Sequence, residues 1–556
     1  MRPAVSGLTA LILLLACRGD DAPESAREVG SPGPAVAVTA ASGSPLGTVA
    51  MAASCAEDAQ IHLWRGLALL HNMTYEEAEA NFARATEADP ECAMGYWGQA
   101  MTSIHPLWSD PPGREAFERG GDLVEEARLR TSSDRERAYV DAVARYYDAG
   151  RGDSERPNLV AFEEGWRSFH QAYPGDVEGT AFYALAQLAT VDPADKTFAK
   201  QREAGALAEE VLETVPDHPG GHHYVIHAYD NPALSAEAEE VARSYGDIAP
   251  DVPHALHMPS HTFTRLGLWR ESIDWNRRSA DAALEHPVGG ATSLHYFHAL
   301  DYLAYAFLQG AQDRRAVEVM EELKGVEPPF QAHLATAYTL AAVPARIALE
   351  RHAWNEAGSL EPRRPADYPW DGAPAMEAIT WFARALGAAR SGDLEQARAD
   401  LEALGDLQER VASRDAYWGT QVEIQRLSAL GWLLFEEGQR TEGLETMRRA
   451  AEMEAGTEKH PVTPGEVLPA RELLGDMLLE MDRPEEAAAA YAAALDRSPN
   501  RLNSLYGAAR AAEMAGRHGE ARRHYAALLA VTSEADTDRP RLQQARAYLE
   551  AGAAEG

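Results

Sequence analysis

A spacing of 34 residues recurs along this chain and constrains its fold more than any other feature. The clearest copy places small residues, an aromatic residue and a proline at fixed intervals, at Gly475, Leu478, Ala487, Tyr491, Ala494 and Pro499. The pattern continues at Ala509, Ala521 and Tyr525, and the N-terminal end repeats its intervals at Gly66, Ala78, Phe82, Ala85 and Pro90. Such a period indicates stacked helix pairs, each of which buries its apolar face only against its neighbours.

These intervals resemble the tetratricopeptide (TPR) signature. In that arrangement Gly66 faces the helix crossing where Ala78 lies, and Phe82 fills the gap to the next pair. Ala, Leu and Glu dominate the chain, which also favours helices. We therefore predict an all-α fold, a right-handed superhelical α-solenoid of about ten or eleven TPR-like helix pairs. We divide it into N-terminal repeats over 57–220, histidine-rich repeats over 221–330 and C-terminal repeats over 331–556.

The first 17 residues have the character of a leader. A short apolar run follows Met1 and Arg2 and ends in the letters LLAC at Cys17, which resembles the bacterial lipobox. The resemblance implies that Cys17 carries a lipid; the alternative is an ordinary signal peptide cleaved nearby. Arg18 stands where the rule for inner-membrane retention uses Asp. We predict a secreted, lipid-anchored protein of the bacterial cell envelope, at the outer membrane or periplasmic face, that touches a membrane only through this anchor.

Residues 18–56 are rich in Ala, Ser, Gly and Pro, and we predict a disordered linker there. In an oxidising envelope the two remaining cysteines, Cys55 and Cys92, form either a disulfide or two free thiols. The formal net charge of −36 repels phosphate backbones, so nucleic acid is not expected as a partner.

Nine of the 19 histidines lie between residues 222 and 298. His223 and His227 are four residues apart and share a helix face, and a shift of 34 residues leads from them to His257 and His261. His295 and His298 share a face on a third helix. That helix reads as longer than its predecessors, and counting back from its following turn places Asp301 and Tyr305 at the level of the earlier histidines.

In tetratricopeptide proteins these faces line the concave groove. We therefore predict a site for a divalent transition metal (zinc, copper or iron), since imidazole is the commonest ligand for these ions and carboxylates often orient it. The candidate ligands are His223, His227, His257, His261, His295 and His298, and the candidate supporting groups are His254, Asp230, Asp301 and Tyr302. Two alternatives remain open: a histidine acting as a general acid or base, and histidines that only bond one another in a polar groove.

The segments CAMGYWGQAM, HHYVIHAYDNP, HALHMPSHTFTRLGLW, YFHALDYLAYAFLQG and KHPVTPGEVLPARELLGD resemble one bacterial group of tetratricopeptide proteins. The resemblance implies the fold and leaves the activity open. Our first functional hypothesis is an envelope-anchored scaffold that holds a partner protein, peptide or other ligand in its groove. The alternative is a metal-dependent enzyme with the histidine cluster as its active site. A purely structural spacer is a third reading.

Overall fold

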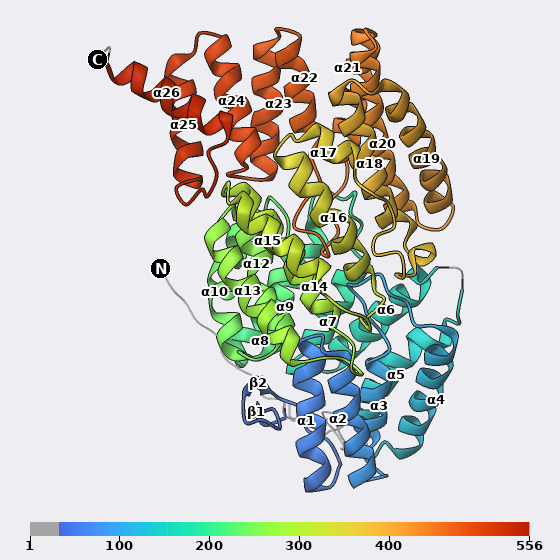
Figure 1. Cartoon of the computed structure of the whole chain (residues 1–556). Coiled ribbons are helices and arrows are strands. Elements are labelled where there is room, and N and C mark those ends of the chain that lie inside the picture. The colour runs from blue at the N-terminus through green and yellow to red at the C-terminus, as the bar shows by residue number, and fades with distance from the viewer. Residues whose placement is uncertain (1–32, 153, 555–556) are drawn as a thin grey trace, which may run out of the picture.

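Antiparallel helix pairs follow one another along the computed structural model, which describes residues 33–152 and 154–554 (Figure 1). The architecture is an all-α superhelical solenoid, as predicted. Helices α1–α4 lie at one end of the molecule and α22–α26 at the other (Figure 1). Among the described helices, none combines the length and apolarity that crossing a bilayer requires.

The element bounds are as follows. The N-terminal helices are α1 (Glu57–His71), α2 (Tyr75–Ala88), α3 (Ala93–Met101), α4 (Arg114–Arg130), α5 (Asp134–Asp148), α6 (Arg156–Ala172), α7 (Val177–Ala189) and α8 (Ala199–Thr214). The histidine-rich region holds α9 (Pro219–Ala228), α10 (Glu239–Ile248), α11 (Pro253–His257), α12 (Pro259–Leu266), α13 (Trp269–Glu285), α14 (Leu294–Gln309) and α15 (Asp313–Lys324). The C-terminal helices are α16 (Leu334–Glu350), α17 (Trp354–Gly358), α18 (Pro374–Ser391), α19 (Leu394–Ala412), α20 (Ala416–Glu436), α21 (Arg440–Ala455), α22 (Ala470–Glu480), α23 (Pro484–Arg497), α24 (Leu502–Met514), α25 (His518–Val531) and α26 (Pro540–Ala554).

Small residues and one aromatic ring bring the helices together as the spacing predicts. Phe82 of α2 is fully buried between Gly66 of α1 and Gly98 of α3. A methyl group on Gly66 would lie 2.8 Å from the Phe82 ring, and one on Gly98 would lie closer still. Tyr491 occupies the same position between Gly475 and Gly507. The small residues are therefore required by the close approach of each ring.

Successive turns of the superhelix touch one another. His71 at the end of α1 bonds Tyr224 of α9, with Nδ1 and the phenol oxygen 2.9 Å apart. Further along, the Trp269 indole N–H donates to the carbonyl oxygen of Asn500, 3.0 Å away. These contacts bury the inner surface of the solenoid, which an extended repeat array would leave open.

A β-hairpin precedes the helices, and it overturns part of the predicted disorder. Strands β1 (Val36–Thr39) and β2 (Pro45–Val49) pair antiparallel. Leu46 and Val49 are buried, and the Thr48 N–H donates to the carbonyl oxygen of Asp217, 3.1 Å away. The prediction of disorder over 18–56 is thus wrong for residues 33–56, because the hairpin packs beside α1 and the start of α9. Residues 18–32, and the leader with Cys17, lie outside the described residues.

Two connections leave the repeat pattern and enter the interior. One is the segment 102–113 between α3 and α4, which carries the buried Trp108. The other is residues 456–469 between α21 and α22, here called the inner segment. Arg346 of α16 holds it by donating to the carbonyl oxygens of Gly465 and Glu466, each 2.8 Å away. Both segments cover the concave side of the histidine-rich repeats.

The two cysteines that flank the first repeat are joined. Cys55, just before α1, and Cys92, just before α3, form a disulfide with a Cα–Cα distance of 4.7 Å. Of the two readings that the sequence left open, the structure shows the disulfide.

Candidate metal centre

Helices α9, α11, α12 and α14 bring seven histidines into one buried cluster. The helices are neighbours because consecutive pairs stack, and the i, i+3 and i, i+4 spacings keep the imidazoles on one face of each helix. His227 is half-buried and the other six are almost fully buried. Six of the seven histidines form two sets of three, and within each set the potential ligand atoms lie within 4.8 Å of one another.

The second set comprises His257, His261 and His298. The Nε2 atoms of His257 and His261 are 3.0 Å apart. Their Nδ1 atoms face acceptors: Asn276 Oδ1 lies 2.7 Å from His257 Nδ1, and Asp230 Oδ2 lies 2.9 Å from His261 Nδ1.

The Asn276 amide is itself fixed, because its NH₂ donates to the carbonyl oxygen of Ser272, 2.7 Å away. Its oxygen must therefore face His257. Burial lowers the pKa of His257 well below its ordinary value, and it lowers the pKa of His261 despite the opposing bond to Asp230.

The third member of the second set, His298, completes a compact group. Its ring centroid is 4.0 Å from that of His257 and 6.1 Å from that of His261. Its Nδ1 atom is buried and has no hydrogen-bond partner in the described chain. Burial lowers the pKa of His298 as well. Three neutral imidazoles thus converge from α11, α12 and α14.

The first set comprises His223, His227 and His254. The His223 Nδ1–H donates to the carbonyl oxygen of His71, 2.6 Å away, and its Nε2 lies 3.2 Å from Nε2 of His254. Burial lowers the pKa of His223 to about 3. Within the described chain, Nδ1 of His254 and both ring nitrogens of His227 are buried without a partner.

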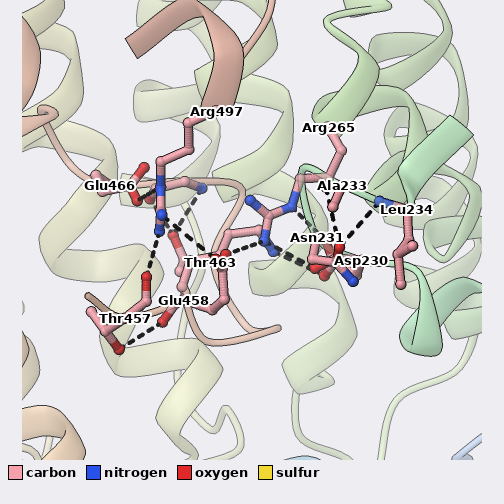
Figure 2. Close-up of polar contacts among 12 residues, drawn as sticks. Asp230, Asn231, Ala233, Leu234, Arg265, Thr457, Glu458, Thr463, Glu466 and Arg497 are labelled. Atoms are coloured by element: carbon pink, nitrogen blue, oxygen red, sulfur yellow. Dashed lines mark hydrogen bonds and ion pairs between the residues drawn. The ribbon is translucent and has the colours of Figure 1, made fainter. Parts of the chain in front are cut away.

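Asp230 anchors the edge of the cluster through an ionic network. Arg265 Nε lies 2.8 Å from Asp230 Oδ1, and Lys459 Nζ lies 2.9 Å from Oδ2. Figure 2 shows Arg265 pointing at Asp230, with Glu458 of the inner segment beside it. Burial alone would raise the pKa of Asp230, but Lys459 and Arg265 hold it well below its usual range. Asp230 is therefore a carboxylate that orients His261 from the side away from the cluster.

Side chains from distant repeats cover the cluster. The Trp108 ring lies 5.3 Å from His254, 5.9 Å from His295 and 5.5 Å from His298, centroid to centroid. Tyr302 donates to the carbonyl oxygens of Pro461 and Thr463, both 3.1 Å away. The predicted open groove is therefore closed here by the chain itself.

The third helix aligns differently from the predicted register. The rings of His295, His298 and Tyr302 lie against those of His254, His257 and His261, at centroid distances of 5.0, 4.0 and 5.2 Å. The shift is 41 residues at all three positions (254 to 295, 257 to 298 and 261 to 302). The observed and the predicted shifts, 41 and 34 residues, differ by seven, which is about two helical turns, so both place the same face of α14 toward the histidines. Tyr302, not Tyr305, stands at the level of His261, and His298 takes the level expected for Asp301.

The structure shows which of the predicted supporting groups contact the two sets of histidines. His254 lies inside the first set and Asp230 supports the second. Asp301 does not support the histidines, because its carboxylate pairs with Arg346 Nε, 3.1 Å away. His295 lies next to His254 but outside both sets.

A third group of possible ligands was missed by the sequence analysis. His71 Nε2 and His218 Nε2 lie 2.7 and 3.2 Å from the two carboxylate oxygens of Glu178. The other nitrogens are also used: His71 Nδ1 faces Tyr224, and His218 Nδ1 accepts from the backbone N–H of Gly221. Because every ring nitrogen has a protein partner, this group is a structural network that joins α1, α7 and α9.

Trp108, Arg265 and Lys459 were also missed as parts of the site. Trp108 and Lys459 lie in connections outside the repeat pattern, so the spacing of the repeats does not predict where they lie. A cavity of about 500 Å³ adjoins this edge of the cluster, with Leu107, Leu159, Leu188, His227, Lys459 and Pro461 among its lining residues. It is of a size that small molecules occupy.

One family model matches part of the helix-pair array. The family model of the tetratricopeptide repeat matches residues 468–501, which hold α22 and α23. The chain therefore contains a tetratricopeptide repeat over these residues, within its all-α solenoid fold. A comparison with curated proteins gives no match.

Solved structures similar to this chain include the APC/C hetero-tetramer Cut9–Hcn1, at 13% identity over 88% of this chain and 75% of that chain, with a TM-score of 0.34. Yeast Tom70 is 10% identical over 89% of this chain and 96% of that chain, with a TM-score of 0.34. The TPR domain of P58(IPK) is 11% identical over 89% and 99%, with a TM-score of 0.20.

Proposed function

We propose that this chain is a metal-binding tetratricopeptide solenoid whose second set, His257, His261 and His298, holds a transition-metal ion. The observation that carries the proposal is the 3.0 Å separation of His257 Nε2 and His261 Nε2. Each Nδ1 faces an oxygen acceptor and so carries the ring proton. In the neutral rings both Nε2 atoms then present lone pairs to each other, an arrangement that a cation between them stabilises.

The distances suit a single ion. Two nitrogens bound at about 2.0–2.1 Å with tetrahedral angles lie about 3.3 Å apart, close to the separation of these two Nε2 atoms. Protonating one ring would also relieve the contact, but Lys459 and Arg265 already place two cations at Asp230, and burial opposes a third. The bonds from Nδ1 to Asn276 and Asp230 are the outer contacts that orient metal-bound imidazoles.

The ligand atoms of the second set limit which metals can bind there. The second set offers imidazole nitrogens without a thiolate or a carboxylate, which suits zinc, copper, iron and nickel better than magnesium or calcium. Copper(II) binds most tightly among the first-row divalent ions, and zinc is the other ion for which imidazole is a usual protein ligand. We therefore propose one of these two as the resident ion.

The solenoid supports a second role as a scaffold for a protein partner, as tetratricopeptide arrays present large surfaces. Because the inner segment and Trp108 cover the histidines, we place such a partner on other faces of the array. The Cys55–Cys92 disulfide supports an oxidising compartment, in line with the proposed lipid-anchored location at the bacterial envelope.

A metal-dependent enzyme is the second candidate, because the cavity beside the cluster reaches His227. Its test uses azide, a small anion that binds open metal positions. Azide should change the visible spectrum of the cobalt-loaded chain if the ion is accessible. An unchanged spectrum at saturating azide would argue against catalysis at this centre.

The proposal is tested by metal analysis of the chain with and without both Nε2 ligands. Asparagine places a side-chain N–H near the position of Nδ1, so the His257→Asn/His261→Asn variant keeps the bonds to Asn276 and Asp230 and removes both ligand nitrogens. The wild-type chain should retain a stoichiometric ion after gel filtration and melt at a lower temperature once chelator removes it. Absence of a retained ion after incubation with copper or zinc, with no chelator effect on melting, would sink the proposal.

A further inference from the structure

The first set shares two features with the second, a close pair of Nε2 atoms and a ring whose Nδ1–H is committed to an oxygen acceptor. The Nε2 atoms of His223 and His254 are 3.2 Å apart, and the Nδ1–H of His223 is committed to the carbonyl oxygen of His71, 2.6 Å away. That carbonyl fixes the ring so that Nε2 carries the lone pair. The His71 carbonyl oxygen therefore orients the His223 ring in the same way that the Asp230 carboxylate orients the His261 ring.

The remaining nitrogens of the first set lack the partners that buried imidazoles normally have. Nδ1 of His254 and both ring nitrogens of His227 are buried with no hydrogen-bond partner in the described chain. A buried polar atom without a hydrogen-bond partner costs free energy, so each such atom in a folded protein requires an explanation. Three are found within one set whose ligand atoms lie within 4.8 Å of one another.

The two sets are in direct contact. The rings of His227 and His261 lie 5.4 Å apart, and those of His254 and His257 lie 5.9 Å apart, centroid to centroid. Each pair joins one member of the first set to one member of the second. Ions about 2 Å from their ligand nitrogens would therefore be neighbours inside one cluster.

We propose that the first set binds a second ion, so that the six histidines form a dinuclear centre of two copper or zinc ions with three imidazoles each. This inference rests on the proposed function, which requires only the ion of the second set. The inference adds that the chain binds two ions and that these ions lie close together. It also places His227, the member of the first set that lines the cavity, at the outer edge of the centre.

Charge balance indicates what else the centre must hold. The six ligands are neutral, and the nearby carboxylate of Asp230 is already matched by Arg265 and Lys459. Two divalent ions therefore need an anion that the protein does not supply. A metal-bound water that releases its proton to solvent through the adjoining cavity would supply this anion as hydroxide, because the ions lower the pKa of that water.

Copper(II) titration followed by electron paramagnetic resonance tests the inference on the full chain. The chain, stripped by chelator and gel-filtered, should bind two equivalents. The signal should grow over the first equivalent and fall by more than half over the second, because neighbouring copper(II) ions couple. Two equivalents with a signal that grows in proportion to bound copper would overturn the dinuclear centre, since the ions would then lie apart.

Matched variants distinguish the inference from the function on which it rests. The His223→Asn/His254→Asn variant keeps a side-chain N–H that can donate to the His71 carbonyl, and it should bind one equivalent with an undiminished signal. The control His286→Asn, on a half-exposed histidine away from the cluster, should behave as wild type. One equivalent in the wild-type chain would overturn the inference and leave the proposed function standing. No bound copper in any variant would overturn both, and circular dichroism of each variant confirms folding.

Discussion

The Arg346 guanidinium lies 2.8 Å from the carbonyl oxygen of Gly465 and 3.1 Å from the carboxylate of Asp301, so one buried side chain ties α16 to both α14 and the inner segment. We expect Arg346→Met to leave Asp301 as an unpaired buried charge and to lower the free energy of unfolding by about 3–5 kcal/mol. Hydrogen exchange should rise first in residues 456–469.

A matched control for this change is Arg448→Met, because Arg448 pairs with Glu486 on the exposed surface. That variant should change the free energy of unfolding by less than about 1 kcal/mol. Equal destabilisation by the two variants in urea would contradict the assigned role of Arg346.

Stability should fall as the pH falls below about 6.5. Burial lowers the pKa of His333 to about 4 and that of His460 to about 3. Below about pH 6.5 these histidines bind a proton in the unfolded chain but not in the folded chain, which favours unfolding. As the pH falls from about 7.5 to about 5.5, each of them therefore lowers the free energy of unfolding by about 1.4 kcal/mol.

The variant His460→Asn checks this pH dependence. An asparagine oxygen can still accept from the Val462 N–H, as His460 Nδ1 does at 3.1 Å, but it cannot titrate. Over the same pH interval, the free energy of unfolding of the variant should fall by about 1.4 kcal/mol less than that of wild type. Urea titrations at the two pH values measure the difference, and parallel losses would refute the assignment.

Removing the disulfide should destabilise the N-terminal repeats. Cys55 and Cys92 are separated by 37 residues, and opening a loop of that length costs about 3–4 kcal/mol. The Cys55→Ser/Cys92→Ser variant should therefore unfold at lower urea than wild type. Reductant should shift the midpoint of wild type toward that of the variant and leave the variant unchanged.

The ring pockets at the helix crossings should tolerate no extra methyl group. Gly98→Ala places its Cβ against the Phe82 ring and should cost about 1–3 kcal/mol. Gly121→Ala, in α4 with open space around its Cβ, should gain up to about 1 kcal/mol from helix propensity. In thermal melting, Gly98→Ala should lower the Tm and Gly121→Ala should leave it unchanged or raise it.

Ligand membership gives a further expectation for the histidines. His298→Asn should weaken copper binding because it removes a member of the second set, whereas His295→Asn should keep the full stoichiometry because His295 lies outside both sets. Equilibrium dialysis against copper distinguishes the two. A loss of one equivalent in the His295 variant would require a different ligand assignment.

The sequence predicted the helix pairs, the small-residue crossings and the shared face of the histidines, because each depends on contacts within a repeat or between neighbours. The 41-residue alignment of α14 was missed, since two registers that differ by seven residues, about two helical turns, give the same pattern of faces. Trp108 and Lys459 could not be placed either. They reach the cluster from connections whose course depends on how the superhelix turns, which no local pattern encodes.

The hairpin illustrates the same limit at the N-terminal end. Its strands, with the sequences VAVT and PLGTV, lie in a segment whose richness in Ala, Ser, Gly and Pro predicted disorder. Contacts with residues far along the chain order them. The Thr48 backbone reaches Asp217, and the Ala50 N–H donates to Glu178 Oε1, 2.6 Å away. Neither partner lies close enough in sequence for a local reading to find it.

The inner segment has a consequence for the order of assembly. All six histidines of the two sets lie between residues 223 and 298, whereas the inner segment, one of the two segments that cover them, lies at 456–469. During synthesis the ligands and Trp108 therefore leave the ribosome well before the inner segment exists. An ion supplied while the C-terminal third is still missing meets a cluster that is open on the side of the inner segment, whereas an ion supplied later can enter on that side only when the inner segment moves away. The time of metal delivery, as much as affinity, would then decide which ion the finished protein contains.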